Sequence, residues 1–343
     1  MGTKILVTGG TGYVGSHTVV ELQNSGFDVV IADNLCNSKK EIVTQIEKIT
    51  GIKPEFEHVD LKSPEETFGI FKKHNDIPGV IHFAAYKAVG ESMQYPLKYY
   101  HNNLYSLINL LKAMEEYSVN NFVFSSSCTV YGNPDSLPVT EKAPVKPALS
   151  PYGNTKQISE EIISDTVYTS QLKGISLRYF NPVGAHSSGL IGELPLGVPD
   201  NLVPFITQTA IGKRDKLKVF GNDYPTPDGT CIRDYIHVED LAKAHVVAIN
   251  RLIKEKQKDE YEVFNLGTGK GYSVLEVVKT FEEVTGVKLN YEITNRRPGD
   301  VPEVWAETKL ANKELGWKAE KSLTDMMKTA WIWEKNLAEN KIF

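Results

Sequence analysis

Short apolar runs alternate with helical stretches along the first half of the chain. Each run has the length of a buried strand. Strands that alternate with helices indicate an α/β fold, in which helices cover both faces of a doubly wound parallel sheet. The predicted strands are Lys4–Thr8, Asp28–Ala32, Glu55–Val59, Val80–Ala84, Asn121–Ser125 and Ile175–Tyr179.

The pattern loosens from about residue 182. Proline and glycine become frequent between Pro182 and Gly229, and the strand–helix units are shorter and less regular. We therefore predict a second, smaller region of mixed α/β structure. The larger domain is expected to span 1–181 with returning segments from about 230–270, and the smaller one to take the remainder of about 182–343.

Capping residues predict where two helices begin. Ser38 and Glu41 have the spacing of a capping box. The run Ser63–Glu66 offers a serine N-cap, a proline at the first helical position and the acid of a capping box.

Composition narrows the class of protein. The 343 residues include 38 Lys plus Arg and 43 Asp plus Glu, and the resulting net charge of −5 argues against a nucleic-acid or anionic-membrane partner. The three cysteines, Cys36, Cys128 and Cys231, have neither disulfide-framework nor zinc spacing, and the scattered histidines predict no metal site. No apolar run is long enough for a membrane helix. These features together predict a cytoplasmic protein.

A glycine-rich loop follows the first predicted strand. Gly9, Gly12 and Gly15 lie between that strand and a helix that ends near Gly26. Glycines at this place let the backbone approach a pyrophosphate, whose charge is then held at the helix N-terminus. Asp33 ends the next strand, 18 residues after Gly15, where a carboxylate accepts hydrogen bonds from a ribose and repels a 2′-phosphate. The pattern predicts a dinucleotide site that prefers NAD to NADP.

A second glycine cluster, Gly267–Gly271, lacks the spacing of a phosphate-binding loop. It lies between the apolar run Val263–Leu266 and Ser273, a good N-cap residue. We predict a tight strand-to-helix turn there, with no catalytic role.

A tyrosine and a lysine one turn apart are the candidate catalytic pair. Ser150 and Pro151 predict the start of a helix, on which Tyr152 and Lys156 share one face. A lysine ammonium beside a phenol favours the phenolate and would lower the pKa of Tyr152, which suits a general acid/base. The hydroxyl run that ends at Ser127 would lie at the carboxyl edge of the sheet, where such folds bind ligands.

These features together resemble the extended, sugar-nucleotide-modifying branch of the short-chain dehydrogenase/reductase superfamily, whose fold is Rossmann-like. Within that branch the sequence looks like the UDP-glucose (UDP-galactose) 4-epimerases. The similar stretches run from residue 7 to residue 300 and are VTGGTGYVGSHT, DNLCNS, HFAAYKAVGES, FSSSCTVYG, SPYGNTK, RYFNPVGAH, GNDYPTPDGTCIRDYIHVEDLA and RRPGD.

The resemblance implies the residues of two binding sites. Besides the glycines and Asp33, NAD would contact Tyr13, Val14, Asn34, Leu35, Cys36, Asn37, Ser38, Asp60, Leu61, Phe83, Ala84, Ala85, Tyr86, Lys87, Asn102, Ser127, Tyr152, Lys156 and Phe180. The UDP-sugar would contact Lys87, Ser127, Tyr152, Asn181, Asn201, Leu202, Lys218, Phe220, Arg233, Tyr235, Arg297, Asp300 and Val304.

The resemblance also implies an activity, which is the reversible 4-epimerisation of UDP-glucose and UDP-galactose through a transient 4-keto sugar, with tightly bound NAD. Tyr152 would move the proton of the 4-hydroxyl, Ser127 would position the oxygen, and Lys156 would hold the nicotinamide ribose. The family implies a homodimer formed by the helices near Asn102–Ser118 and Tyr152–Ser170.

Other NAD-dependent enzymes of the branch remain as alternatives. A 4,6-dehydratase would carry an Asp-Glu pair after the hydroxyl strand, and a uronate decarboxylase a glutamate in the same segment, whereas this chain has Cys128 and Thr129. A non-catalytic NAD-sensing protein would be expected to have lost Tyr152 or Lys156, and both are present.

Two positions bear on the sugar nucleotide. Arginines such as Arg233 suit a diphosphate, although Arg233 followed by Asp234 also fits a local surface ion pair. In the family, the position of Val304 acts as a gate, and a small residue there leaves room for a 2-acetamido group. We therefore expect activity on UDP-N-acetylglucosamine and UDP-N-acetylgalactosamine as well, unless Val304 simply packs under Trp305.

Overall fold

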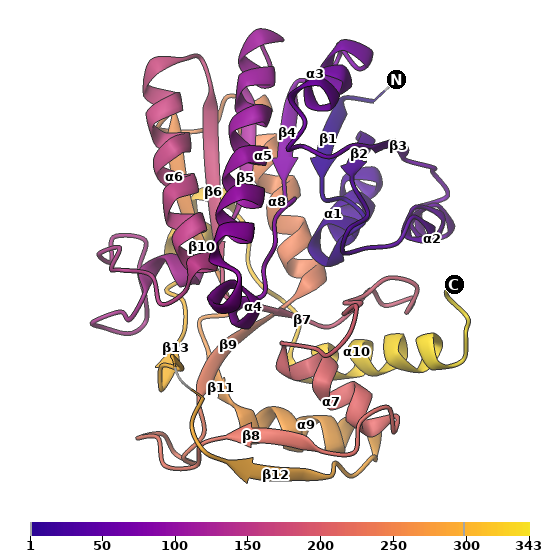
Figure 1. Cartoon of the computed structure of the whole chain (residues 1–343), viewed down its shortest axis with the longest axis vertical. Helices are drawn as coiled ribbons and strands as arrows, with labels where there is room; N and C mark the ends of the chain where they lie inside the picture. The colour runs from indigo at the N-terminus through magenta and orange to yellow at the C-terminus, as the bar shows by residue number, and fades with distance from the viewer. Residues whose placement is uncertain (1, 298) are drawn as a thin grey trace.

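The computed structural model describes residues 2–297 and 299–343. Within these residues, seven parallel strands form the main sheet (Figure 1), in the order β10-β6-β5-β4-β1-β2-β3. Their bounds are β1 (Lys4–Thr8), β2 (Asp28–Asp33), β3 (Glu55–His58), β4 (Gly79–His82), β5 (Asn121–Ser127), β6 (Lys173–Tyr179) and β10 (Tyr261–Leu266). The predicted doubly wound parallel sheet is thereby confirmed.

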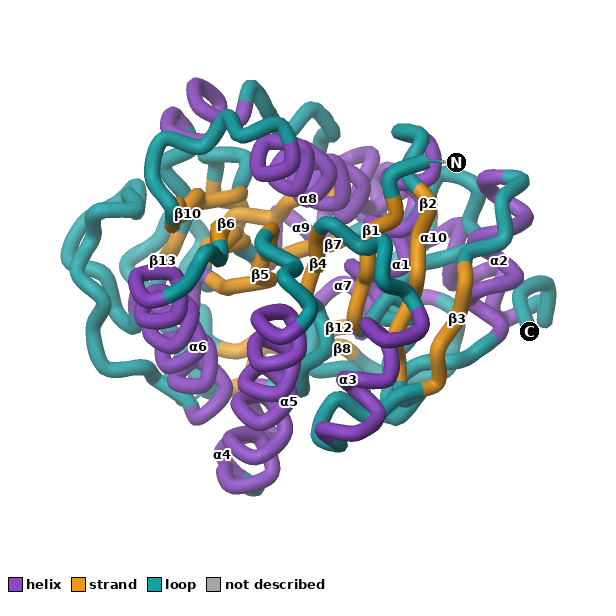
Figure 2. Tube along the Cα trace, turned by 90° about the horizontal axis from the view of Figure 1, so that it is seen from above, coloured by secondary structure: helices purple, strands orange, loops and turns teal. Residues whose placement is uncertain are grey.

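Helices cover both faces of this sheet, as Figure 2 shows from above. One layer holds α1 (Tyr13–Asn24), α2 (Glu41–Thr50) and α8 (Val238–Ile253), and its apolar side chains form one core cluster with the sheet. The other layer holds α3 (Pro64–Lys73), α5 (Pro96–Glu116) and α6 (Pro151–Thr169), which form a second cluster, and the short α4 (Val89–Gln94) precedes α5. Two buried cores on opposite faces explain why the inner strands β1 and β4 are largely apolar, whereas the edge strand β3 is not.

The strand order reverses beside β1. The chain proceeds from β1 outward through β2 and β3, and then crosses to β4 on the other side of β1. The loops after β1 and β4 therefore diverge and leave a crevice at the carboxyl edge of the sheet, which is the usual ligand site of such folds. The fold by itself places the glycine loop and the 83–87 segment at this crevice.

The second half of the chain adds smaller sheets below the carboxyl edge (Figure 1). Strands β7 (Asn181–Val183), β11 (Gly271–Ser273) and β13 (Glu303–Val304) pair with β9 (Ile232–His237), and β8 (Leu217–Phe220) pairs with β12 (Tyr291–Thr294). Helices α7 (Leu202–Ala210), α9 (Val274–Thr285) and α10 (Leu323–Ala338) pack on them, and η2 (Ala311–Leu315) contacts α8. Because α8 and β10 return to the main sheet, the chain crosses between the two parts more than once. The exact division into two domains stays a prediction.

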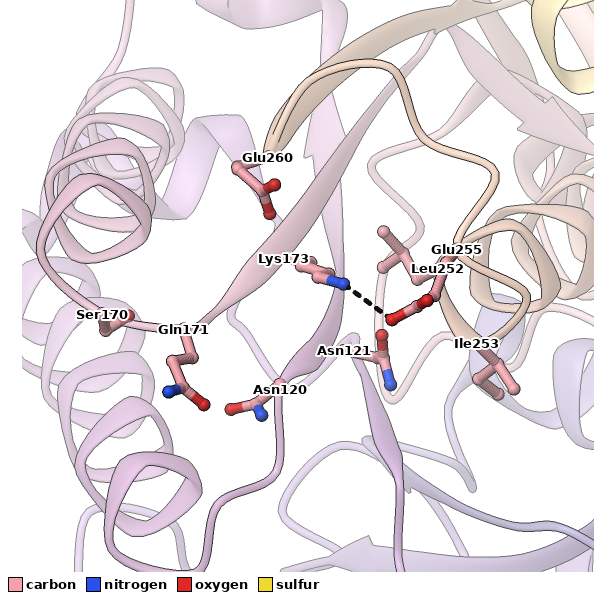
Figure 3. A pocket seen from close by; sticks show the side chains of 9 residues that line it. All are labelled: Asn120, Asn121, Ser170, Gln171, Lys173, Leu252, Ile253, Glu255 and Glu260. Carbon is pink, nitrogen blue, oxygen red and sulfur yellow. Dashed lines mark hydrogen bonds and ion pairs between the residues drawn. The ribbon is translucent and has the colours of Figure 1, made fainter.

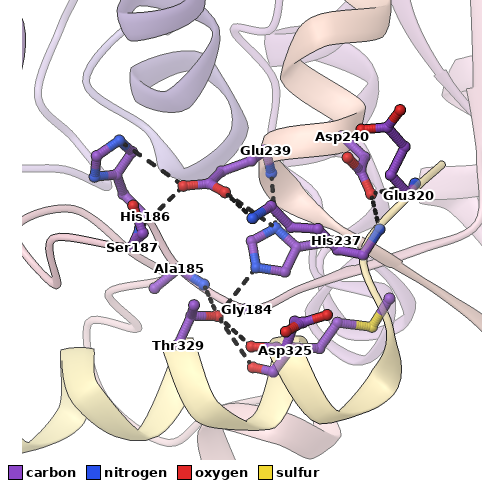
Figure 4. Close-up of polar contacts among 12 residues, drawn as sticks. Gly184, Ala185, His186, Ser187, His237, Glu239, Asp240, Glu320, Asp325 and Thr329 are labelled. Carbon is purple, nitrogen blue, oxygen red and sulfur yellow. Dashed lines mark hydrogen bonds and ion pairs between the residues drawn. The ribbon is translucent and has the colours of Figure 1, made fainter. Parts of the chain in front are cut away.

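A polar cluster holds the two parts together (Figure 4). His237, the last residue of β9, caps α8 by accepting a hydrogen bond from the amide of Glu239 at 3.1 Å, and its other ring nitrogen lies 3.1 Å from the Thr329 hydroxyl of α10. The Glu239 carboxylate accepts a hydrogen bond from the Ser187 amide at 3.0 Å. The loop after β7 and helix α10 are therefore anchored to a helix of the main sheet.

The capping predictions have two outcomes. Ser63 accepts a hydrogen bond from the Glu66 amide at 3.3 Å, as expected, but the Glu66 carboxylate accepts from the Asp60 amide at 2.8 Å and does not close the predicted capping box. Ser273 caps α9 as expected and forms a full capping box with Glu276. The box at Ser38 is wrong, because α2 begins with Lys40 as its N-cap and the Ser38 hydroxyl donates to Asp33 at 3.2 Å instead. A carboxylate at the end of β2 competes successfully for this serine.

Candidate active site

The glycine loop runs tightly between β1 and α1. Gly9 has a φ of +69°, and a Cβ atom there would lie 2.8 Å from the Ala84 nitrogen. A Cβ on Gly15 would lie 2.2 Å from the Gly9 oxygen. The N-cap of α1 is Gly12, which provides no side-chain hydrogen bond to the first turn. The first turn of α1 therefore keeps backbone N–H groups that no side chain caps, as a pyrophosphate site at a helix N-terminus requires.

Asp33 is held by the loops on either side of it. Its Oδ2 accepts a hydrogen bond from the Thr11 amide at 3.1 Å, and its Oδ1 accepts from the Leu35 amide at 2.9 Å and from Ser38. A carboxylate has about four acceptor positions, so Oδ2 keeps one for a ribose hydroxyl. The tight glycine loop and this fixed carboxylate fit NAD.

The segment after β4 forms the other side of the crevice. The Phe83 amide donates to the Thr8 carbonyl at 3.0 Å, which ties the segment to β1 directly before the glycine loop. Further on, the Tyr86 amide donates to the Asn103 side chain at 2.8 Å, next to the predicted Asn102. Asp60 and Leu61 follow β3, the neighbour of β2. The structure thus brings the predicted NAD residues together around one strand edge.

Lys87 reaches from the 83–87 segment toward the second part of the molecule. Its Nζ lies 5.6 Å from the ring centroid of Tyr13 and 2.7 Å from the Glu193 carboxylate. The same Glu193 oxygen accepts a hydrogen bond from the Asn201 amide nitrogen at 2.6 Å, and the Tyr13 hydroxyl donates to the Gly184 carbonyl at 2.7 Å. Residues predicted for the cofactor and for the UDP-sugar are therefore neighbours, joined by a glutamate that the sequence did not single out.

The three predicted catalytic residues lie on adjacent elements. Ser127 ends β5, and Tyr152 and Lys156 lie on the first turns of α6, whose N-cap Ser150 accepts a hydrogen bond from the Gly153 amide at 3.1 Å. Thr129 in η1 (Cys128–Tyr131) donates to Ser127 from its amide and its hydroxyl, at 3.2 and 3.0 Å. Both acceptor positions of the serine are thereby used, so its own proton is left for donation.

Burial dominates the electrostatics of this site. It raises the pKa of the Tyr152 phenol well above its usual value, and a side-chain hydrogen bond with Ser127 opposes the shift only in part. Burial also lowers the pKa of Lys156 to about 7. The prediction that Lys156 lowers the pKa of Tyr152 is therefore wrong for this structure, because desolvation of both groups outweighs their interaction.

The predicted UDP-sugar residues gather around β9. Register pairs Asn181 with Tyr235 and Val304 with Arg233 across neighbouring strands. The Arg233 guanidinium lies 3.6 Å from the Asp300 carboxylate, to which Arg297 also donates at 2.9 Å. The Arg297 guanidinium lies 5.7 Å from the ring of Phe220 at the end of β8, where Lys218 is exposed, and Leu202 begins α7 directly after Asn201.

Asp234 has a different role from the one predicted. Its side chain is fully buried, and it accepts hydrogen bonds from the amides of Thr268, Gly269 and Ala306 at 2.8, 3.0 and 3.1 Å. The surface ion pair with Arg233 is wrong, because successive residues of a strand point to opposite faces. Asp234 instead fixes the loop after β10 and the segment after β13, beside Val304.

Val304 is 9% exposed and belongs to a small apolar cluster with Phe180, Val130 and Tyr131. Phe180 directly follows β6 and is the aromatic residue predicted near the nicotinamide. Val304 therefore packs toward the catalytic edge rather than only under Trp305.

One hollow in the described residues lies away from the catalytic residues. It has a volume of about 550 Å³ and is lined by Asn121, Lys173 and Glu255, among others (Figure 3). Asn121 and Lys173 are the first residues of β5 and β6, so the hollow is at the amino edge of the sheet, opposite the catalytic residues. We assign it no part in the site.

Comparison with known proteins gives the family. Residues 6–330 match the family model described as GDP-mannose 4,6 dehydratase. The chain is 50% identical to the UDP-glucose 4-epimerase of Bacillus subtilis (strain 168), over 97% of both proteins. A crystal structure of the Stenotrophomonas maltophila UDP-glucose 4-epimerase with bound NAD and formylated UDP-arabinopyranose superposes with a TM-score of 0.95, at 47% identity and with 98% of this chain and 99% of that chain covered.

A more distant structure is that of the Campylobacter jejuni UDP-Glc/GlcNAc 4-epimerase, with a TM-score of 0.84, 36% identity and coverage of 98% of this chain and 100% of that chain. The family model is described by a dehydratase, whereas the full-length relatives named here are UDP-glucose 4-epimerases. The chain is therefore a member of the UDP-glucose 4-epimerase family, within the extended short-chain dehydrogenases/reductases.

Proposed function

We propose that the protein interconverts UDP-glucose and UDP-galactose by inverting C4 of the hexose. The observation that carries this proposal is the meeting of Ser127, Tyr152 and Lys156 at the carboxyl edge of the sheet, next to the glycine loop and the β9 residues. C4 bears no acidic proton, so its configuration can be inverted only by removing the stereocentre through oxidation to a 4-ketone. NAD, when bound, supplies the hydride acceptor and donor for that chemistry.

The side chains around C4 have distinct tasks. As the phenolate, Tyr152 takes the proton from the 4-hydroxyl, and the phenol so formed returns the proton in the second half of the reaction. Ser127 donates its proton to the sugar oxygen, since Thr129 occupies its acceptor positions. The Lys156 ammonium, anchored by donation to the Ser125 carbonyl at 2.6 Å, stabilises the developing phenolate. The ketosugar must turn over before the return step, so the UDP group has to be held while the hexose moves.

The residues that support UDP binding lie on the far side of the site. Arg233 and Arg297 share the Asp300 carboxylate, which holds both guanidinium groups on one side of the cleft. A diphosphate would receive forked hydrogen bonds from such a pair. Asn181, on β7, links this side to the end of β6.

The dehydratase and decarboxylase alternatives lack a suitable acid after β5. Cys128 stands directly after Ser127, and burial raises the pKa of its thiol to about 12. This thiol is therefore no substitute for a carboxyl group at neutral pH. The 4-epimerase reaction needs no further acid, which favours it.

The decisive experiment is incubation of the purified protein with UDP-galactose and identification of the product by NMR. The expected product is UDP-glucose with no 4-keto-6-deoxy sugar, and a parallel incubation with UDP-glucuronic acid should yield no pentose nucleotide. Accumulation of either of the latter would replace this proposal by a dehydratase or a decarboxylase.

We further propose that the enzyme accepts the 2-acetamido sugars. Val304 is small and lies in the apolar cluster with Phe180, where a tyrosine would project a ring toward the sugar. A structurally similar protein acts on both UDP-Glc and UDP-GlcNAc, according to its description.

A two-fold homodimer is the proposed assembly. Helices α5 and α6 pack against each other and leave apolar side chains in solvent, above all Leu97 of α5, 80% exposed, and Tyr168 of α6, 83% exposed. Burial of such side chains in a helix-to-helix interface would remove them from water. Sedimentation velocity checks this, with a mass twice that of the chain expected. A cytoplasmic location, expected from three cysteines that are free in the structure, also stays a prediction.

A further inference from the structure

Helix α6 carries a third polar residue toward the sheet, one turn after Lys156. Glu160 is buried and forms a forked ion pair with Arg178 of β6, at 2.9 Å from Nε to Oε1 and 2.5 Å from the terminal nitrogen to Oε2. The Ser126 hydroxyl of β5 donates to the same carboxylate at 2.5 Å. One carboxylate thus joins the catalytic helix to the two strands beneath it.

The network continues to the segment after the catalytic serine. Arg178 donates to the Tyr131 hydroxyl at 3.0 Å, and this hydroxyl donates to Asn265 of β10 at 2.7 Å. Tyr131 ends η1, the turn that begins directly after Ser127. The groups that flank the catalytic residues are therefore held by a single set of buried hydrogen bonds.

Ser126 is the middle residue of the hydroxyl run. The carbonyl of Ser125 before it accepts the hydrogen bond from Lys156, and Ser127 after it is the proposed sugar contact. The hydrogen bond from Ser126 to Glu160 of α6 therefore fixes the position of Tyr152 and Lys156 along β5 relative to Ser127. A shift of about 1 Å in such an arrangement can cost about 100-fold in rate.

Glu160 is also the anion that faces Lys156. The other groups around the ammonium are Tyr152 on α6, the Ser125 carbonyl and the Phe124 ring on β5, His82 on β4, and Tyr179, which is hydrogen-bonded to Ser125. Burial lowers the pKa of His82 to about 3 and raises that of Tyr179 to about 12, so both are neutral near pH 7. Glu160 raises the pKa of Lys156 and so opposes the larger effect of burial.

A buried ion pair is a costly way to stabilise a fold. Well-packed apolar residues of similar volume often serve stability as well or better. Neither Glu160 nor Arg178 is among the residues expected to touch NAD or the sugar nucleotide. Their place beside Ser126 and Lys156 is thus best explained by the geometry and charge of the reacting groups.

We infer that Glu160 is a positioning residue for the reaction, which with Arg178 aligns α6 on β5 and keeps Lys156 cationic. This inference rests on the proposed function, since it assigns Glu160 a role through Lys156 and Tyr152. It extends the catalytic set without adding a group that touches the substrate.

The test compares Glu160→Gln with Glu161→Gln, its exposed neighbour on the same helix. We expect Glu160→Gln to lower kcat for UDP-galactose at least tenfold and to move the alkaline limb of its pH profile to lower pH by about one unit, because Lys156 loses its proton earlier. Glu161→Gln should leave both unchanged. A Glu160→Gln enzyme with the wild-type alkaline limb would overturn the inference.

Two further variants keep the test decisive if Glu160→Gln leaves Arg178 unpaired and fails to fold. The double variant Glu160→Gln with Arg178→Gln removes both charges, and its alkaline limb should still move. Ser126→Ala keeps the ion pair, so kcat should fall while the limb stays in place. Thermal unfolding of each variant measures how much of the protein is folded at the assay temperature.

A second measurement does not depend on turnover. NMR titration of protein with ¹³C-labelled lysine follows the ionisation of Lys156, assigned by its missing signal in Lys156→Met. The Lys156 pKa should be lower by about one unit in Glu160→Gln than in wild type. If the Lys156 pKa is the same in Glu160→Gln and in wild type, the proposed effect of the Glu160 charge is wrong, even if the protein is active. If the pKa shifts as expected but the wild type has no epimerase activity, only the proposed function is wrong.

Discussion

The Nζ atom of Lys156 donates to the Ser125 carbonyl at 2.6 Å and lies 6.0 Å from the ring centroid of Tyr152. The lysine is thus fixed to the strand that ends at the catalytic serine, while its charge stays within reach of the phenol. Both side chains are buried, and burial moves the two pKa values in opposite directions, up for the phenol and down for the ammonium. Each group is therefore held nearer to its neutral form than it would be in water.

The buried lysine predicts a pH-dependent stability. Its pKa is about 7 in the folded chain against 10.5 for a free lysine. Between these values the unfolded chain binds a proton that the folded chain does not, so stability at this position rises with pH. The cost of burying the charge is fully present below pH 7.

Lys156→Met should therefore stabilise the protein more at pH 6 than at pH 9. The difference expected between the two pH values is about 3 kcal/mol, at about 1.4 kcal/mol for each unit of pKa. Urea unfolding at both pH values measures it, with Lys112→Met on the exposed side of α5 as the control. An equal effect of Lys156→Met at both pH values would show that the lysine is charged in the folded protein throughout this range.

Tyr152→Phe tests the proton carrier. The change removes one oxygen from a buried ring, so we expect NAD binding and the melting temperature to stay close to wild type. We expect kcat to fall by about 10²–10⁴-fold, the usual contribution of general acid/base catalysis, with a smaller change in KM. A Phe variant within about tenfold of the wild-type kcat would contradict the assignment of Tyr152.

Asp33 predicts selectivity for NAD over NADP. Its carboxylate is held by Thr11, Leu35 and Ser38, so it cannot swing away from a 2′-phosphate. We expect calorimetry to show at least about tenfold tighter binding of NAD, from the repulsion that a fixed carboxylate exerts on a phosphate. Asp33→Ser combined with Asn34→Arg should reduce the difference, whereas Asp28→Ser at the start of the same strand should not. Equal affinities in the wild type would show that Asp33 does not face the ribose.

Local sequence signals predicted most of the nucleotide half correctly. Strand β1 and the starts of β2 and β5 were placed to the residue, and Ser150 caps α6 as expected. These features depend on neighbours within a few positions along the chain. Ser38 shows where such local signals fail. Its hydroxyl could have capped a helix, but it donates a hydrogen bond to Asp33, five residues earlier, instead.

The buried network around Glu160 could not be predicted in this way. Its partners, Ser126, Arg178, Tyr131 and Asn265, are on four different segments, and only the strand order brings them together. The sequence offered one signal for this network, which is that Lys156 and Glu160 are one helical turn apart and therefore share a face of the helix. The Arg233–Asp234 ion pair was left open for a similar reason, since no strand was predicted at β9, and only that strand puts the two side chains on opposite faces.

Val304 provides the test of substrate range. Val304 is buried in a cluster with Phe180 and Tyr131, and we expect a tyrosine at this position to direct its larger ring toward the sugar. We expect Val304→Tyr to lower kcat/KM for UDP-N-acetylgalactosamine by about 10–100-fold, which is the usual effect of crowding a pocket, and to change kcat/KM for UDP-galactose much less. The ratio of the two constants is the measurement, because it cancels any general loss of active protein. If the wild type has no activity on acetamido sugars, or if the ratio does not change, other residues set the size of the sugar pocket and the 4-epimerase assignment is unaffected.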